Sequence, residues 1–215
     1  MKRHHTTTIF RPPAKVRGAA ALISLSVLAL LAAPASAYDV RAEAKLYNAV
    51  HNQVGKVRLT QEGDGNVAVH ITVHDLDPGF HGFHVHAVGS CTVVENVAPF
   101  TSAGGHFDLG THPHGNHAGD FPVLLVQSDR TANVKFNTDR FKLDDLFDDN
   151  GSAIIIHAGR DNYANIPDRY AIVGTRATGP DAATLATGDS GARVACGALE
   201  RIVKRDKGRD DDNDR

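Results

Sequence analysis

Residues 54–73 read VGKVRLTQEGDGNVAVHITV, and their pattern decides the fold class. Apolar and polar side chains alternate over residues 54–61 and again over 67–73, as in strands that bury one face. Asp64-Gly65-Asn66 lies between the two runs and is typical of a tight turn. The stretch therefore predicts a β-hairpin.

Other parts of the chain extend this β pattern. Further strands are predicted at residues 123–127, 132–137, 153–157 and 194–199. Two long segments, 89–120 and 158–193, lack strand periodicity and are rich in Gly, Pro, Asp, Asn or His. Long loops in a compact domain are usually functional. No convincing helix stands out, and residues 143–147 could form a short turn. We therefore expect an all-β antiparallel barrel or sandwich with two long functional loops.

The first 37 residues have the features of an export signal. Five basic residues begin a stretch that becomes nearly all apolar over residues 18–33 and ends in Ala35-Ser36-Ala37, a small-residue cleavage site. The apolar run is short for a membrane span, so we expect cleavage after Ala37, with a retained anchor as the alternative. No cysteine directly follows this site, which argues against a lipoprotein. No other stretch is apolar enough to cross a membrane.

The rest of the chain has an acidic balance. Residues 1–37 hold five of the 23 basic residues and none of the 25 acidic ones, which leaves 18 against 25 and a net charge of −7. This charge argues against a general affinity for nucleic acid. Residues 38–200 suffice for one domain. The almost wholly charged segment 201–215 is expected to be a disordered tail.

The chain has two cysteines, Cys91 and Cys196. An even number in an exported chain favours one disulfide, and two unpaired buried thiols are the alternative. A bridge would close a loop of about 105 residues, for which the chain-entropy argument gives roughly 4.7 kcal/mol of stabilisation.

Thirteen histidines is a high number for this length, and their positions suggest metal binding. His84 and His86 are separated by one residue, so on a strand both rings would face one side and could reach one ion. Two stacked surface histidines would give the same pattern. His157 ends the apolar run 153–156, where a hydrogen-bonded core histidine is the alternative.

A denser group of candidate ligands lies in the first long loop. Its members are His106, His112, His114, His117 and Asp120, interspersed with four glycines that let the backbone fold tightly around an ion. Three imidazoles and one carboxylate would complete a tetrahedral zinc shell without an open position, which is typical of a structural site. A solvated, His-rich loop is the alternative.

Five ordered motifs resemble those of the copper/zinc superoxide dismutases. They are GFHVH at 82–86, SAGGHF at 102–107, HGNHAGD at 114–120, IHAG at 156–159 and GARVACG at 191–197. DNYANIP at 161–167 is similar to the bacterial branch of that family. The resemblance covers residues 40–199. It implies an eight-stranded Greek-key barrel that converts superoxide to oxygen and hydrogen peroxide with a redox copper and a structural zinc.

The resemblance also implies a role for each site residue. It assigns copper to His84, His86, His106 and His157, and zinc to His106, His114, His117 and Asp120. His106 would bridge the two ions and supply a proton. Asp161 matches an aspartate that links a copper-bound to a zinc-bound histidine. Arg193 matches the arginine that attracts superoxide beside the copper, and Cys91 and Cys196 match the intrasubunit disulfide.

One departure from the family pattern concerns the zinc ligands. The segment between His106 and His117 is shorter than in the animal enzymes and offers two candidates, His112 and His114. The His-Gly step favours His114, and His112 stays the alternative. The second long loop lacks the acidic and lysine cluster of the animal enzymes. His81 resembles a structural histidine of the barrel that is hydrogen-bonded to the backbone.

Two other functions are alternatives to a dismutase. One is a non-catalytic copper-binding or copper-delivery protein of the same fold, although such relatives often lack a copper ligand or the arginine. The other is a structural zinc module, which would leave His84, His86 and His157 without a role. Monomer and homodimer are both open, as are secretion, retention in the cell envelope and a periplasmic location.

Overall fold

The predicted hairpin consists of strands β2 (Gln53–Gln61) and β3 (Val67–Val73) in a computed structural model, which describes residues 38–171 and 173–205. The antiparallel register pairs Gly55 with Val73 and Gln61 with Val67. Gly65 has a positive φ of 90° in the turn, a conformation that a side chain would strain. Buried residues alternate along both strands, so the sequence pattern identified the inward face correctly.

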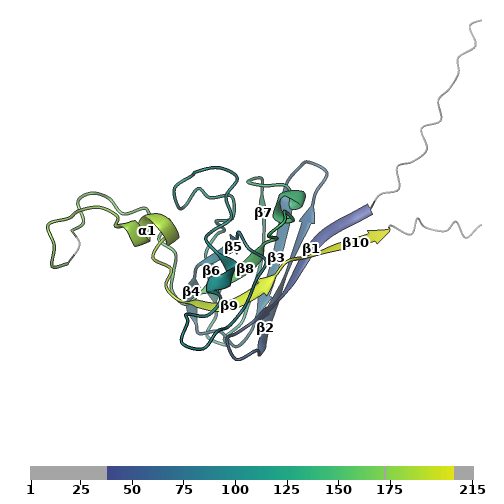
Figure 1. Ribbon diagram of the computed structural model, residues 1–215, viewed down its shortest axis with the longest axis horizontal. Helices are drawn as coiled ribbons and strands as arrows, with labels where there is room; N and C mark the ends of the chain where they lie inside the picture. The colour runs from purple at the N-terminus through teal and green to yellow at the C-terminus, as the bar shows by residue number, and fades with distance from the viewer. Residues whose placement is uncertain (1–37, 172, 206–215) are drawn as a thin grey trace, which may run out of the picture. The chain divides into compact units, whose positions relative to one another are not determined.

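The described part of the chain contains ten strands, which Figure 1 labels. Besides β2 and β3 they are β1 (Tyr38–Tyr47), β4 (Gly79–His81), β5 (Phe83–His86), β6 (Leu124–Val126), β7 (Ala132–Thr138), β8 (Ala153–His157), β9 (Arg193–Ala198) and β10 (Glu200–Arg205). Helical structure among these residues comprises the 3-10 turns η1 (Thr101–Ala103) and η2 (Leu143–Leu146) and the helix α1 (Ala182–Thr187). The fold is all-β, as predicted.

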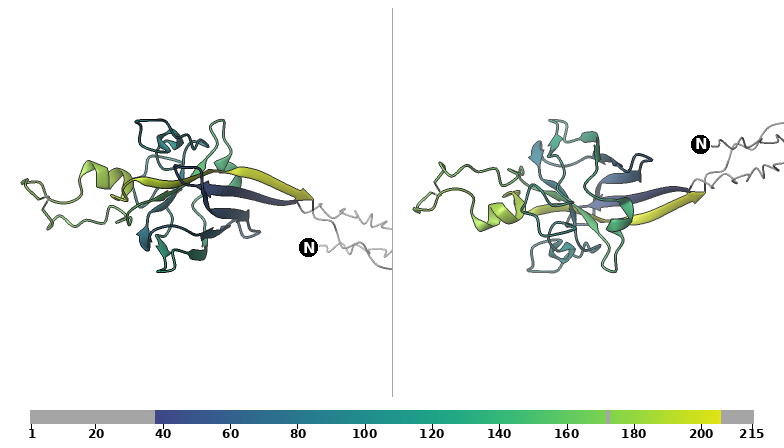
Figure 2. Two further views of the ribbon diagram at one scale, coloured as in Figure 1. Left: turned by 90° about the horizontal axis from the view of Figure 1, so that it is seen from below. Right: turned by 90° about the horizontal axis from the view of Figure 1, so that it is seen from above.

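Most strands belong to one curled sheet with the order β5-β8-β9-β1-β2-β3-β7. β10 also pairs with β1, and the two strands run side by side in Figure 2. β4 and β6 form a separate antiparallel pair. Only Gly82 separates β4 from β5, and only Leu199 separates β9 from β10, so the ten strands make eight runs. The first and last runs are neighbours, and β3 pairs with β7 across a long connection. The predicted eight-stranded Greek-key barrel is confirmed.

Apolar side chains of the strands fill the interior of the barrel. Fully buried members of the main core cluster include Leu46, Leu59, Ile71, Ile154 and Ile156. A second cluster joins Phe100 and Ala103 of the first long loop to Ala153, Ile155 and Cys196 of the sheet. The first long loop is therefore packed on the barrel rather than extended into solvent.

The predicted disulfide is present and fixes this loop further. Cys91 and Cys196 are bonded, with their Cα atoms 5.7 Å apart. Nearby, Ser102 Oγ donates to the carbonyl of Ser90 at 3.1 Å and accepts the N–H of Thr92 at 3.0 Å. Bridge and hydrogen bonds together tie the start of the loop to β9.

The C-terminal segment differs from the prediction of a disordered tail beginning at residue 201. Residues 201–205 belong to β10, which lies beside β1 and pairs with it as far as Tyr38–Arg205 (Figure 1). The pairs Tyr47–Cys196 and Glu43–Glu200 share one register, so β10 continues the ladder of β9. Residues 206–215 and the predicted signal, residues 1–37, lie outside the described residues.

The short helix α1 was not predicted from the sequence. Its N-cap, Asp181, accepts the N–H of Thr184 at 2.8 Å, and Gly188 ends it with a positive φ of 63°. Across residues 38–171 and 173–205, the structure contains no helix with the length and apolar character that a membrane crossing requires.

Candidate metal centres

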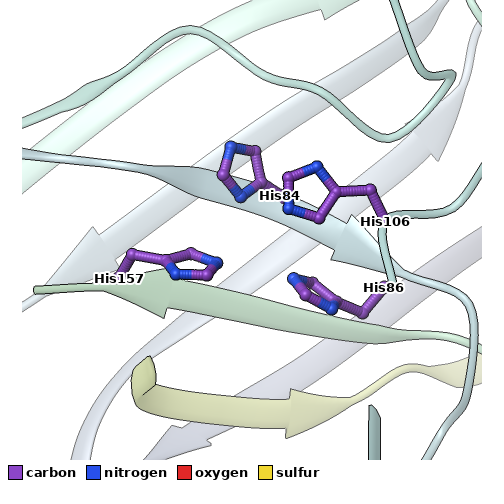
Figure 3. A group of neighbouring side chains, drawn as sticks. All are labelled: His84, His86, His106 and His157. Carbon is purple, nitrogen blue, oxygen red and sulfur yellow. The ribbon is translucent and has the colours of Figure 1, made fainter. Parts of the chain in front are cut away.

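Four histidines from three parts of the fold face one another (Figure 3). His84 and His86 lie on β5, His157 ends β8, and His106 follows η1 in the first long loop. β5 and β8 are paired, and an isolated bridge joins His86 to His106. One nitrogen of each ring lies within 4.8 Å of the others, and the stacked rings of His84 and His106 have centroids 4.0 Å apart. The structure thus brings together all four predicted copper ligands.

Backbone carbonyls fix the orientation of two of these rings. His86 Nδ1 donates to the carbonyl of Gly104 at 2.9 Å. His157 Nδ1 donates to the carbonyl of Gly191 at 3.0 Å. A ring whose Nδ1 carries the donated proton presents Nε2 with a free lone pair.

The inward nitrogens of the cluster are buried and lack hydrogen-bond partners. These atoms are His84 Nδ1 and the Nε2 atoms of His86, His106 and His157. A buried polar atom without a partner is costly and uncommon in native proteins. Four of them facing one another therefore fit a bound ion, and imidazole nitrogens suit copper in both of its oxidation states.

Burial keeps the rings of His86, His106 and His157 neutral. It lowers the pKa of His86 to about 2 and that of His157 to about 3, and the nearby Arg193 charge acts in the same direction. Burial also lowers the pKa of His106 to about 4, although its hydrogen bond to Asp120 opposes the shift. Imidazole binds metals in its neutral form, so the rings are ready to act as ligands near neutral pH.

A second cluster begins on the other side of the His106 ring. His106 Nδ1 is 2.8 Å from Asp120 Oδ1, which lies 3.3 Å from His117 Nδ1. His114 Nδ1 is 3.4 Å from Asp120 Oδ2. Burial alone would raise the pKa of Asp120, but hydrogen bonds from His106 and His114 hold it well below its usual range. Three imidazoles and one carboxylate form a donor set suited to tetrahedral zinc.

The two candidates for the zinc ligand, His112 and His114, lie in different surroundings. His114 is buried and belongs to the second cluster. The His112 side chain is 56% exposed, and its Nδ1 lies 2.8 Å from Asp108 Oδ1. His112 also donates its backbone N–H to Asp108 Oδ2 at 2.9 Å. His114, and not His112, therefore lies among the residues of the second cluster.

Asp161 connects the two clusters. Its carboxylate accepts from His84 Nε2 at 2.7 Å and from His114 Nε2 at 2.8 Å, and it also accepts the backbone N–H of Tyr163. Burial alone would lower the pKa of His114, but its bonds to Asp120 and Asp161 raise it to about 9, so a zinc ion binding there would displace a proton. Because Nε2 of each ring is bonded to Asp161, His84 directs its Nδ1 at the first cluster and His114 directs its Nδ1 at the second.

Arg193 lies beside the first cluster on the loop side. Its guanidinium donates to the carbonyl of Phe100 at 2.5 Å and to that of Gly104 at 2.6 Å. The Gly104 carbonyl is also the acceptor for His86, so one backbone group positions both side chains. The packed first loop and β9 therefore hold a permanent positive charge near the histidines.

Residues 53–199 match the family described as copper/zinc superoxide dismutase. The chain belongs to this family. The Cu-Zn superoxide dismutase of Mycobacterium tuberculosis is 46% identical over 134 residues, which cover 59% of this chain and 55% of that protein. The alignment thus spans little more than half the length of that relative. The corresponding protein of Mycolicibacterium paratuberculosis is 39% identical over 176 residues, covering 78% of this chain and 77% of that protein.

Solved structures agree with this membership. The Cu/Zn superoxide dismutase from Brucella abortus superposes with a TM-score of 0.57 at 29% identity, covering 74% of this chain and 99% of that one. A SOD-like protein from Bacillus subtilis gives a TM-score of 0.55 at 33% identity, covering 74% and 97%. Copper/zinc superoxide dismutases bind both metals, and the two clusters of this chain could hold both.

Some residues that shape the centres carry no signal in the sequence. Gly104 and Gly188 act through their carbonyl or through their lack of a side chain, and Arg140, which follows β7, bonds to the loop. Glycine and arginine are too common to single out without spatial neighbours. The prediction for His81 is confirmed, because its two ring nitrogens lie 2.6 and 2.8 Å from the carbonyls of His157 and Asp77.

Proposed function

We propose that this chain is a superoxide dismutase, which converts two superoxide ions and two protons to oxygen and hydrogen peroxide. The observation that carries the proposal is the set of four buried ring nitrogens without partners in the first cluster. Membership of the copper/zinc superoxide dismutase family supports it. Nitrogen ligands suit a redox copper, whereas a His₃Asp set suits zinc.

The proposal assigns each ring atom to an ion. Copper would be held by His84 Nδ1 and by Nε2 of His86, His106 and His157. Zinc would be held by Nδ1 of His106, His114 and His117 and by Asp120. His106 would serve both ions, one nitrogen to each. Its partnerless Nε2 in the first cluster and its Nδ1 at 2.8 Å from Asp120 support this bridging role.

Arg193 would attract the substrate. Bound copper would supply the two oxidation states that the reaction needs, which zinc lacks. A guanidinium stays protonated at neutral pH and draws anions toward a site by long-range attraction. The Gly104 carbonyl, to which both Arg193 and His86 donate, supports its closeness to the proposed copper site.

His106 would move a proton. Formation of hydrogen peroxide consumes protons, and Nε2 of His106 is the atom proposed to deliver one while Nδ1 stays on the zinc side. The test is X-ray absorption of the oxidised and reduced protein. The number of nitrogen neighbours around copper should fall on reduction, and an unchanged number would contradict this step.

The test of the whole proposal uses the full chain, dialysed free of metals and then reconstituted. With copper and zinc we expect rapid superoxide consumption in a pulse-radiolysis assay. A sample that binds both metals without consuming superoxide would favour a non-catalytic copper-binding protein. Binding of zinc without copper, when both are supplied, would favour a structural zinc module.

We also propose that the protein is exported and loses residues 1–37. The disulfide supports an oxidising compartment. N-terminal sequencing of the protein recovered from its producing cells tests this directly. A mature chain beginning near Tyr38 is expected, and an intact N-terminus on the exported protein would indicate a retained anchor.

A further inference from the structure

The turn that contains His117 is held from two sides. On the inner side, Asp120 Oδ2 accepts the backbone N–H groups of Gly115 at 2.7 Å and of His117 at 3.0 Å. On the outer side, Arg140 Nη1 donates to the carbonyls of the same two residues at 3.1 and 3.0 Å. Asp120 is a member of the second cluster, whereas Arg140 is not.

Arg140 is anchored in the barrel rather than in either long loop. It follows β7, and its backbone N–H donates to Thr138 Oγ1 at 3.3 Å. The next residue, Phe141, is buried and packs its ring against those of Phe107 and Phe121. Phe107 and Phe121 directly follow two members of the second cluster along the chain. Residues 140–141 therefore join the sheet to the segment that bears the cluster.

We propose that Arg140 is a positioning residue for zinc, a role that rests on the proposed zinc site. By fixing the carbonyls of Gly115 and His117, it holds His117 Nδ1 and Asp120 at the spacing that tetrahedral coordination of zinc requires. Groups outside the ligand set that orient ligands in this way typically change metal affinity about 10- to 100-fold when they are removed.

Charge and positioning predict opposite signs for the loss of Arg140. A guanidinium beside a cation site opposes binding of the cation, so removing its charge alone should strengthen zinc binding. Removing the two hydrogen bonds should weaken binding, because the free turn must be ordered when the ion binds. The sign of the change therefore separates the two effects.

The experiment compares four forms of the full chain: wild type, Arg140→Met, Arg140→Lys and Arg130→Met. Arg130 is a matched control, since it is 47% exposed and donates to Asp77 and to the carbonyl of Asp75, away from the clusters. Metal-free samples are titrated with Zn²⁺ against a competing chelator, and with Co²⁺ for its visible absorption.

Arg140→Met should bind Zn²⁺ about 10- to 100-fold more weakly than wild type and give an altered Co²⁺ spectrum. Arg140→Lys keeps the charge and donors on a long side chain and should restore most of the affinity. Arg130→Met should match wild type.

Equal or tighter Zn²⁺ binding by Arg140→Met would overturn the inference. A loss of Zn²⁺ affinity in Arg140→Met would also overturn it if the metal-free variant melted well below metal-free wild type. Such a result would mark a general structural role. A wild type that binds no Zn²⁺ would overturn the zinc site and this inference together. A wild type that binds both metals but does not consume superoxide would contradict the proposed function alone.

Discussion

Gly188 lies where Asp161 meets His114. It ends α1 in a left-handed conformation with φ 63°, and a Cβ built there would overlap Asp161 Oδ1 and His114 Nε2. The 2.8 Å hydrogen bond between those two side chains therefore requires glycine at this position. The residue makes no bond through a side chain, yet it sets the distance between α1 and the second cluster.

Gly188→Ala is expected to weaken zinc binding about 10- to 100-fold, because the new methyl group displaces the carboxylate that orients His114. The control is Gly174→Ala. Gly174 also has a positive φ, 78°, but nothing lies within 4 Å of a Cβ built there. Both variants share the backbone strain of a side chain at positive φ. In a competition titration, only Gly188→Ala should bind Zn²⁺ more weakly than wild type. Equal Zn²⁺ affinities of the two variants would show that the clash is relieved.

Arg193→Ala is expected to lower the rate of superoxide consumption at low ionic strength by about tenfold or more, since it removes the steering charge. Salt should slow the variant less than wild type, because less attraction remains to be screened. Copper content should be unchanged, as the guanidinium bonds to carbonyls and not to the histidine rings. Stopped-flow rates at several salt concentrations, with metal analysis, check both points. A variant as fast and as salt-sensitive as wild type would remove Arg193 from substrate attraction.

The candidate ligands could be predicted because histidine and aspartate are chemically distinctive and their spacings are local. The His84–His86 pair follows from strand geometry alone. Gly188 and Arg140 act on neighbours 23 or more positions away in the chain, so no local pattern identifies them. The sequence does not separate His112 from His114 for the same reason, since the contact of His112 with Asp108 forms only in the folded loop.

At the scale of elements, strands with a clear apolar pattern were predicted well, whether burial alternates as in β3 or is continuous as in β8. β2, β3 and β8 begin and end within one residue of the predicted bounds, because each has one clear apolar pattern. α1 has only six residues, too few to show a recognisable helical pattern of apolar residues in the sequence, and its ends are set by its caps. β10 has a charged sequence, and the backbone ladder to β1 rather than side-chain burial makes it a strand.

Removing β10 tests its contribution to stability. A chain ending at Leu199 should melt roughly 5–10 °C below a chain ending at Arg205, because it loses a six-residue ladder whose hydrogen bonds each contribute about 1 kcal/mol at most in exposed positions. Metal affinity should be the same in both chains, since β10 lies on β1 and contains none of the cluster residues. Differential scanning calorimetry gives the first value. Equal melting temperatures would show that the strand adds nothing to the barrel.

At the scale of the whole molecule, the barrel supplies rigid strands and the loops supply the remaining ligands. β5 and β8 contribute three members of the first cluster, and the loop over residues 89–120 contributes His106 and the rest of the second. The disulfide and Arg193 join that loop to β9, while Asp161 joins it to the loop over residues 158–193. Metal binding is therefore coupled to the position of both loops on the barrel.

Metal removal is expected to destabilise the entire domain. Four ring nitrogens of the first cluster are buried without hydrogen-bond partners, and an unsatisfied buried polar group costs about 1–3 kcal/mol. Ions that bind only the folded state stabilise it by about 4.1 kcal/mol when present at about 1,000 times their Kd. For a domain of this size that corresponds to a fall of roughly 8–16 °C in melting temperature for each ion removed by chelation. Zinc alone should restore part of the loss and copper the remainder, because His106 is common to both clusters. Calorimetry of the chelated, zinc-loaded and fully loaded chain measures each step, and a melting temperature that does not respond to either ion would contradict the coupling of the centres to the fold.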